Sequence, residues 1–234
     1  MWCRSAKHPG HWDDDELLLG ASNVFGTSVA IYRGSATTLA ATKVGSTPVS
    51  GIPFSAAAIF DTSEKTALVV TELLDPDRFH LYFSTNLVSW QGPFFLGEFT
   101  FNGYLISVEG KGSTMVATVL NPNNQPDEFF MMRSSNGGQT WSPMPGHEDV
   151  IYVQVLTEQL LFALVRQPRG DVGTISKLAK STDGGSTWTL ENALFYGDRI
   201  SFFDALNGVA TAGPTLQITE DGGKTWKLIL APAF

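Results

Sequence analysis

The chain has 234 residues, of which 43% are hydrophobic and 16% charged, and it contains 23 Gly and 12 Pro. This composition is typical of a turn-rich globular protein and not of a disordered or a helical one. Acidic residues outnumber basic ones by 23 to 15, which gives a formal net charge of −8. No cluster of Lys and Arg could neutralise a run of phosphates, so nucleic acid is not expected as a partner.

Residues 1–16 are predicted to be an N-terminal arm, followed by a single domain over 17–234. No apolar segment with a cleavage site begins the chain, and no window reaches the roughly 20 apolar residues that cross a bilayer. We expect a soluble protein, or one peripheral to a membrane surface. His8, His11 and the acidic run 13–16 could bind a divalent cation, but a solvated or partner-docked arm is the preferred interpretation. We therefore expect no metal site and no cofactor.

From residue 16 onward, short β-rich runs alternate with Gly, Pro, Asn or Asp. The first unit supplies "ELLLGAS" (16–22), "NVFGTSVAIYR" (23–33) and "TLAATKV" (38–44). The second unit ends in "STNLVSW" (84–90) and continues into an aromatic-rich stretch up to residue 104. These runs have the composition and punctuation of strands joined by tight turns.

The last unit shows the pattern most clearly. It reads "RISFFDA" (199–205), "NGVATA" (207–212), "TLQIT" (215–219), a turn, and "TWKLIL" (225–230). Four strands in a meander, repeated every 40 to 50 residues or so, are typical of a β-propeller blade. The sequence predicts an all-β fold, a small β-propeller of about five four-stranded blades. Four blades with an N-terminal extension is the alternative, and the N-terminal segment could close the ring by pairing with the last blade.

One eight-residue turn recurs between the third and fourth strands. Its full copies share Ser/Thr, Asp/Asn, Gly, Thr and Trp at matching positions: Ser134, Asn136, Gly138, Thr140, Trp141; Ser181, Asp183, Gly185, Thr187, Trp188; Thr219, Asp221, Gly223, Thr225, Trp226. A carboxylate or amide oxygen accepts the amide hydrogens that follow it, and glycine permits positive φ. The Trp, predicted to begin the fourth strand, is large enough to pack between blades. We interpret the turn as structural, not catalytic.

These motifs resemble Asp-box repeats, also called bacterial neuraminidase repeats, which occur in sialidases, sortilin-type receptors, some glycoside hydrolases and photosystem II stability/assembly factors. "ISFFDALNGVATAGPTLQITEDGGKTW" (200–226) is similar to the assembly-factor repeat in particular. That resemblance implies binding to a membrane complex without catalysis. A sialidase is not expected, because none of the seven arginines lies in the Arg-Ile-Pro context of that family.

The leading hypothesis is therefore a non-enzyme: an accessory or assembly subunit that binds protein subunits of a larger membrane complex, possibly photosynthetic. Exposed aromatic residues would form its partner surface; the candidates are Trp2, Trp12, Phe94, Phe95, Phe99 and Phe101. The alternative is a carbohydrate-binding or glycoside-processing propeller, with a glycan as ligand. For that alternative, carboxylates near first strands are the residues to inspect; they are Asp61, Glu109, Asp198 and Asp204.

Overall fold

The structure is a computed structural model of the whole chain. It describes residues 2–4, 16–22, 28–35, 41–48, 54–62, 64–72, 78–99, 104–121, 128–144, 150–168, 174–191, 197, 199–212 and 215–229.

These residues form twenty strands in five four-stranded sheets, which confirms the all-β propeller prediction with five blades and excludes the four-blade alternative. In chain order the strands are β1 (Trp2–Arg4), β2 (Glu16–Ser22), β3 (Ser28–Ser35) and β4 (Ala41–Pro48); β5 (Phe54–Asp61), β6 (Thr66–Glu72), β7 (Arg78–Ser84) and β8 (Gln91–Glu98); β9 (Tyr104–Lys111), β10 (Thr114–Asn121), β11 (Glu128–Ser134) and β12 (Ser142–Pro143); β13 (Val150–Val155), β14 (Leu161–Pro168), β15 (Thr174–Ser181) and β16 (Thr189–Leu190); β17 (Arg199–Phe202), β18 (Gly208–Ala212), β19 (Thr215–Thr219) and β20 (Lys227–Ile229).

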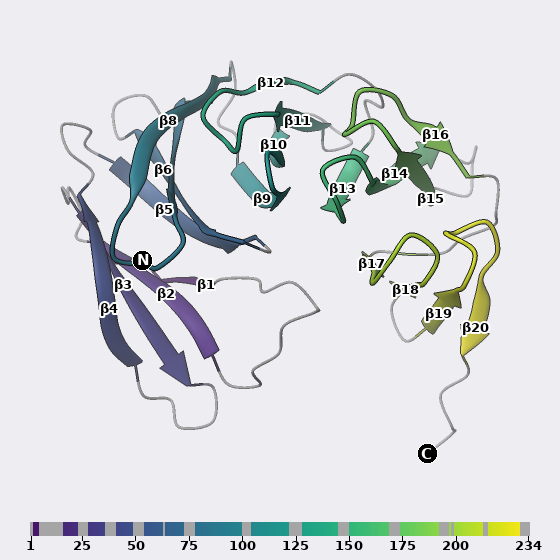
Figure 1. Cartoon of the computed structure of the whole chain (residues 1–234), viewed down its shortest axis with the longest axis horizontal. Helices are drawn as coiled ribbons and strands as arrows, with labels where there is room; N and C mark the ends of the chain where they lie inside the picture. Colours follow the sequence, from purple (N-terminus) through teal and green to yellow (C-terminus); the bar gives the residue numbers. More distant parts are fainter. Residues whose placement is uncertain are drawn as a thin grey trace.

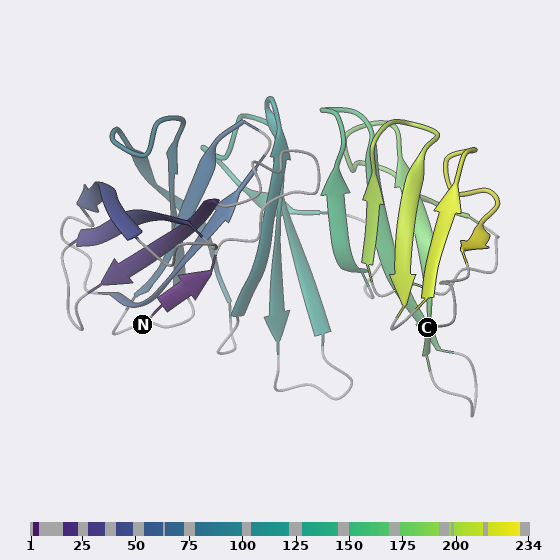
Figure 2. The same cartoon turned by 90° about the horizontal axis from the view of Figure 1, so that it is seen from below.

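Every sheet is an antiparallel meander in which each strand pairs with the next one along the chain. The sheets follow one another around an arc, with the first strand of each toward the middle and the fourth strand at the outside (Figure 1). Figure 2 shows the strands of the third to fifth sheets running along the short dimension of the molecule, from one face of the arc to the other. The arc is open between the first and last sheets (Figure 1).

The core lies in the four seams between consecutive sheets. Val29 and Ile31 of β3 pack against the second sheet, and comparable clusters join the second sheet to the third, the third to the fourth and the fourth to the fifth. In the last seam, the rings of Phe162 and Phe202 stack with centroids 3.6 Å apart. Successive residues of a strand point to opposite faces, so an inner sheet can fill two seams at once.

The N-terminus differs from what the sequence suggested. Trp2–Arg4 form β1, which pairs antiparallel with β2 of the first sheet. The hypothesis that the N-terminal segment closes the ring on the last blade is therefore wrong for these residues. The boundary predicted at residue 16 also falls at the start of β2, so both described parts of the arm belong to the first sheet.

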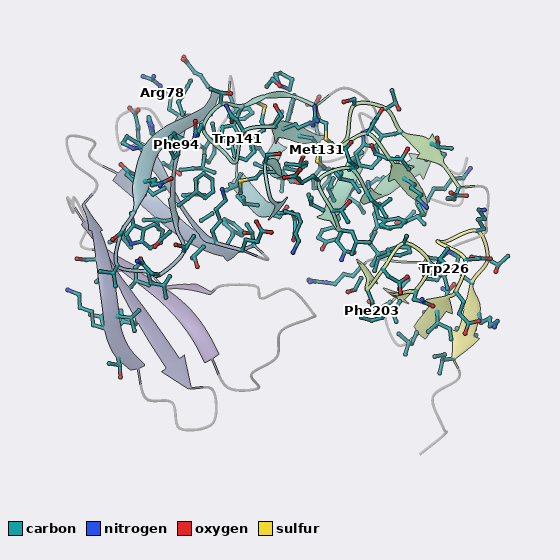
Figure 3. All side chains as sticks on the ribbon, in the orientation of Figure 1. Arg78, Phe94, Met131, Trp141, Phe203 and Trp226 are labelled. Carbon is teal, nitrogen blue, oxygen red and sulfur yellow. The ribbon has the colours of Figure 1, made fainter. Side chains whose placement is uncertain are left out.

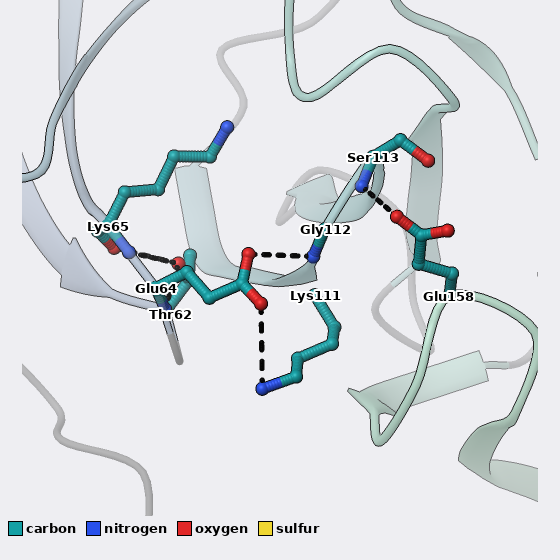
Figure 4. Close-up of polar contacts among 7 residues, drawn as sticks. All are labelled: Thr62, Glu64, Lys65, Lys111, Gly112, Ser113 and Glu158. Atoms are coloured by element: carbon teal, nitrogen blue, oxygen red, sulfur yellow. Dashed lines mark hydrogen bonds and ion pairs between the residues drawn. The ribbon is translucent and has the colours of Figure 1, made fainter.

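Carboxylates link the hairpins that join the first and second strands of neighbouring sheets (Figure 4). Glu64 accepts a hydrogen bond from the backbone N–H of Gly112 at 2.9 Å, and its other oxygen lies 3.5 Å from Nζ of Lys111. Glu158 accepts one from the N–H of Ser113 at 2.6 Å. The amide of Ser113 stabilises the charged carboxylate and so lowers the pKa of Glu158. The β9–β10 hairpin is thus held from both sides by its neighbours.

Candidate functional site

The repeated turn is built in the same way in all three full copies. In the fourth sheet, Oγ of Ser181 donates to Asp183 at 2.8 Å and accepts the N–H of Gly185 at 2.8 Å. Asp183 Oδ1 accepts the N–H of Thr187 at 2.9 Å, and Oδ2 accepts the Thr187 hydroxyl at 2.6 Å. The copy with Thr219, Asp221, Gly223 and Thr225 repeats this set. The copy with Ser134, Asn136, Gly138 and Thr140 differs in one bond, because the Asn136 side-chain amide donates to the Thr140 hydroxyl at 2.8 Å.

These hydrogen bonds stabilise the charged form of the two aspartates. The Thr187 hydroxyl, above all, lowers the pKa of Asp183 to about 2, and the Thr225 hydroxyl does the same for Asp221. A carboxyl held ionised by its own turn is a poor proton donor at neutral pH. The geometry assigns these aspartates to the turn.

Each turn also anchors its sheet to the preceding one. The second glycine has positive φ, 92° at Gly138 and 91° at Gly223. A Cβ at Gly138 would overlap the ring of Phe83, and one at Gly223 would overlap Leu178. The indole N–H of Trp141 donates back to the carbonyl of Gly138 at 2.9 Å, as Trp226 does to Gly223 at 3.1 Å. The fourth strand consequently begins one residue later than predicted, after the Trp.

Residues 84–90, "STNLVSW", form a shortened copy of the turn, which keeps this architecture without glycine. Ser84 accepts the N–H of Leu87 at 2.8 Å, and Asn86 accepts the N–H of Ser89 at 2.8 Å. Leu87 adopts the positive φ, 62°, that glycine takes elsewhere. Its side chain is buried in the seam with the first sheet, and that burial offsets the backbone strain of a left-handed leucine.

A different set of polar residues lies on the inner strands of the third to fifth sheets. Glu109 is in β9, Tyr152 is in β13, and Arg199 is the first residue of β17. β13 packs against both β9 and β17, which brings residues distant in the sequence together at the inner edge of the arc. We call Glu109, Tyr152 and Arg199 the inner-edge cluster.

The members of this cluster interact electrostatically. Burial is the main cause that raises the pKa of the Tyr152 phenol above its usual range; the Glu109 carboxylate raises it further, and the Arg199 guanidinium lowers it. Tyr152 is therefore a neutral hydrogen-bond donor at physiological pH. Oε2 of Glu109 is shielded from solvent, whereas Arg199 is exposed. The cluster offers an acceptor, a phenol ring with a donor, and an accessible cation.

The repeat does not fix the residue type at these positions, although Tyr152 itself packs against the seam with the fifth sheet. In each sheet, the residue just before the repeated turn pairs with a residue of the second strand, which in turn pairs with one of the first strand. These three paired residues form a row across the sheet. The first-strand members of this row are equivalent in the four sheets, and they are Phe60, Glu109, Gln154 and Ser201. The row two residues earlier contains Ser107, Tyr152 and Arg199. The residues that the second and third strands contribute to these rows are mostly apolar, whereas those of the first, inner strand differ in type from sheet to sheet. Divergence among equivalent positions is expected where a site, not the fold, selects the residue.

Sequence reasoning named Glu109 and missed the other two. Tyr152 looked like one more strand residue in "DVIYVQVL", and Arg199 like a strand end. The available signal was the break in apolar character at the first strand of consecutive units, which becomes visible once the register is known.

Of the other carboxylates considered for catalysis, Asp204 is held by its own turn. Asp204 accepts the N–H groups of Leu206 and Asn207, both at 2.7 Å, and so caps the β17–β18 hairpin. The side-chain amide of Asn207 lowers the pKa of Asp204 most strongly. Asp61 is the last residue of β5, and Asp198 lies outside the described residues.

The aromatic residues predicted as a partner surface are divided by the structure. Phe99 is 9% exposed and meets Phe79 edge to face in the core, and Phe94 is half-buried beside Phe83. Both pack in the seam between the second and third sheets, Phe94 from within β8 and Phe99 from the residue that follows it. Phe95 is 42% exposed, with the guanidinium of Arg78 5.0 Å from its ring. Figure 3 shows Arg78 at the outside of the arc.

The other three candidates for that surface are Trp2, Trp12 and Phe101. Trp2 is in β1, while Trp12 and Phe101 lie outside the described residues. Within the described ranges, no three His, Cys, Asp or Glu side chains gather as metal ligands. His8, His11 and residues 13–15 lie outside those ranges. In the part of the chain that the structure describes, no helix has the length and apolarity to cross a membrane.

Comparison with known proteins supports the repeat and the fold. The BNR/Asp-box repeat family matches residues 217–228, which confirms the Asp-box prediction for the last copy. No curated protein is similar to the chain in sequence at a significant level. The likeness to photosystem II assembly factors is not shown.

Three solved structures share the fold. A GH74 xyloglucanase from Xanthomonas campestris has 14% identity and a TM-score of 0.54, over 99% of this chain and 38% of that chain. An oligogalacturonate lyase in complex with manganese has 13% identity and a TM-score of 0.58, over 92% and 61%. An α-L-arabinanase from Penicillium chrysogenum complexed with arabinobiose has 12% identity and a TM-score of 0.52, over 99% and 81%. This chain thus spans less than two thirds of the first two.

These comparisons correct one prediction. The chain was expected not to be an enzyme, yet the solved structures that it resembles include a xyloglucanase, a lyase, an arabinanase and a prolyl endopeptidase. The expectation was drawn from the assembly-factor-like repeat and from the missing sialidase residues, and neither observation excludes the enzymes of other kinds that share this fold. At such identities the likeness itself shows the fold alone.

Proposed function

We propose that this chain is a carbohydrate-processing propeller that holds a glycan at the inner-edge cluster. The observation that carries the proposal is the grouping of Glu109, Tyr152 and Arg199 on three consecutive inner strands, at positions where the repeat does not require them. The xyloglucanase, the lyase and the arabinanase support the choice of a carbohydrate ligand.

The chemistry of the cluster suits a sugar. Glu109 can accept hydrogen bonds from hydroxyl groups, and the neutral phenol of Tyr152 can donate one while its ring packs on sugar C–H groups. Arg199 can pair with a carboxylate or with hydroxyl oxygens. Cleavage of a glycosidic bond by two carboxylates would need a second one beside Glu109. Asp198, which precedes Arg199 in the sequence, is the candidate for that role.

The test is a binding and cleavage screen with xyloglucan oligosaccharides, oligogalacturonates and arabino-oligosaccharides. In Glu109→Gln, cleavage should fall by about 10²-fold or more while binding persists. The amide at this position matches the equivalent Gln154, so the fold should be retained. Arg199→Ala should weaken the binding of acidic oligosaccharides more than that of neutral ones.

Glu220→Gln is the matched control, because Glu220 is an exposed carboxylate on the last turn that pairs with Lys227 at 2.7 Å. It should leave binding and cleavage unchanged. The proposal would be refuted if none of these glycans bound, or if Glu109→Gln and the natural chain cleaved equally.

An accessory subunit that docks on a membrane complex is a second candidate. The observation that favours it is exposed Phe95 under the guanidinium of Arg78, since aromatic and Arg side chains are enriched in protein interfaces. Pull-down of the tagged protein from solubilised membranes tests it: loss of a stoichiometric partner in Phe95→Ala would support this role, and no partner in the natural chain would oppose it.

A further inference from the structure

One position in the repeat has a different environment in the last sheet. The residue three before the turn is Leu81 in the second sheet, Met131 in the third, Leu178 in the fourth and Leu216 in the fifth. The first three are 0%, 7% and 1% exposed, and each lies in the seam with the following sheet. Leu216 is 36% exposed. Leu216 is thus an apolar residue at a seam position, but no described sheet follows to cover it.

The whole face around Leu216 has the same character. Register places Arg199, Thr211, Leu216 and Ile229 in one row across the sheet, with Val209 and Ile218 in the next row on that face. Ile229 is 41% exposed, and Phe203, in the adjoining hairpin, is 59% exposed. The equivalent row of the fourth sheet, Tyr152, Leu164 and Leu178, lies against the fifth sheet. We call this surface the trailing face.

The opposite face of the last sheet is already used. Ile200, Ala210, Gln217 and Leu228 share a row on that side, and Ile200 and Ala210 are buried in the seam with the fourth sheet. Figure 3 shows Trp226 on the side of the fourth sheet and Phe203 on the side of the opening.

The four seams indicate what fits a trailing face. In each seam, the trailing face of one sheet is covered by the opposite, leading face of the next. The chain carries one leading face with no sheet before it, that of β1–β4. There Val29 and Ile31 point to the second sheet, so the alternating residues Ala30 and Tyr32, both half-buried, lie on the leading side.

Among the described residues, these two faces do not meet. They lie at opposite ends of the arc (Figure 1), and among the described residues no strand of the first sheet packs against the last sheet as consecutive sheets pack. A second molecule, in the same head-to-tail relation that joins consecutive blades, would cover both faces.

We propose that the trailing face of the last sheet docks on the first sheet of a second copy of this chain. The contact continues the seam pattern of the fold and is heterologous, because two different surfaces meet. It does not depend on the proposed function.

Sedimentation velocity over a range of protein concentrations tests the proposal. The natural chain should self-associate, and Ile229→Asp should weaken association by about tenfold or more. Leu228→Asp is the matched control, because Leu228 is the neighbouring residue, 54% exposed, on the opposite face. It should associate like the natural chain. A natural chain that stays monomeric at every concentration, or equal loss in both variants, would overturn the proposal.

A mixing experiment tests the head-to-tail arrangement. Labelled Ile229→Asp keeps its first sheet intact, so it should still co-sediment with excess natural chain and terminate its assemblies. If it fails to do so, both copies use the trailing face and the arrangement is symmetric, which contradicts the proposal. Circular dichroism of both variants shows that lost association is not lost folding.

Discussion

The second glycine of each Asp-box turn has two constraints, one from its backbone and one from its neighbour. Gly223 has φ of 91°, and a Cβ there would overlap Leu178 of the preceding sheet. We expect Gly223→Ala to lower the free energy of unfolding by about 2–4 kcal/mol, from left-handed strain and overpacking together. Urea denaturation measures this loss. Gly97→Ala is the control, because its nearest heavy atoms would be at an ordinary 3.5 Å; equal losses would contradict the explanation.

The turn aspartates make stability depend on pH in the acid range. The pKa values of Asp183 and Asp221 are lowered from 3.8 to about 2. Because the folded pKa lies below the unfolded one, their contribution is complete above about pH 4 and is lost as the pH falls toward 2. The double variant Asp183→Asn, Asp221→Asn should therefore flatten the stability curve in this window, as measured by urea denaturation at each pH.

Asn136 shows that an amide fits the turn: its Oδ1 accepts from Thr140 at 2.9 Å, and its Nδ2 donates to the Thr140 hydroxyl at 2.8 Å. The double variant should consequently fold near neutral pH. An unchanged slope between pH 4 and 2 would show that other carboxylates cause the acid sensitivity.

Among whole elements, β17 depends on one side chain of the sheet before it. Gln154, buried in β13, donates to the carbonyl of Phe202 at 2.9 Å and accepts its N–H at 2.7 Å. Gln154→Leu would leave both buried backbone groups without these partners, at a cost of about 2–5 kcal/mol. Hydrogen exchange should accelerate first in β17 and β18. Gln91→Leu, at an exposed position of β8, is the control, and unchanged exchange in β17 would contradict this role.

Across the whole molecule, local stability should follow the order of the seams. The third and fourth sheets have a described neighbour on each side, whereas the fifth has one. Arrays with nearest-neighbour contacts lose structure from their ends. Amide exchange in dilute solution should therefore be slower in β10 and β14 than in β18 and β19. Equal protection at low concentration would mean that the trailing face is covered within a single molecule.

The sequence by itself determined the features that depend on neighbouring residues. Asp221, Gly223 and Trp226 specify a turn through contacts within eight residues, and the β-rich runs around it specify a meander. Repetition of that unit then predicts a propeller, because each copy has two apolar faces that need neighbours. Fold class and blade count followed without any knowledge of long-range contacts.

Tertiary structure alone decided what depends on the relation between blades. Glu109, Tyr152 and Arg199 are far apart in the chain, and β-sheet register brings them to one inner edge. Phe94 and Phe95 are neighbours in the sequence, yet one packs in a seam and the other is exposed, since the two faces of β8 meet different surroundings. Leu216 occupies in the fifth sheet the position that Leu178 occupies in the fourth. Leu178 is buried because a sheet follows it, whereas Leu216 is exposed because no described sheet does.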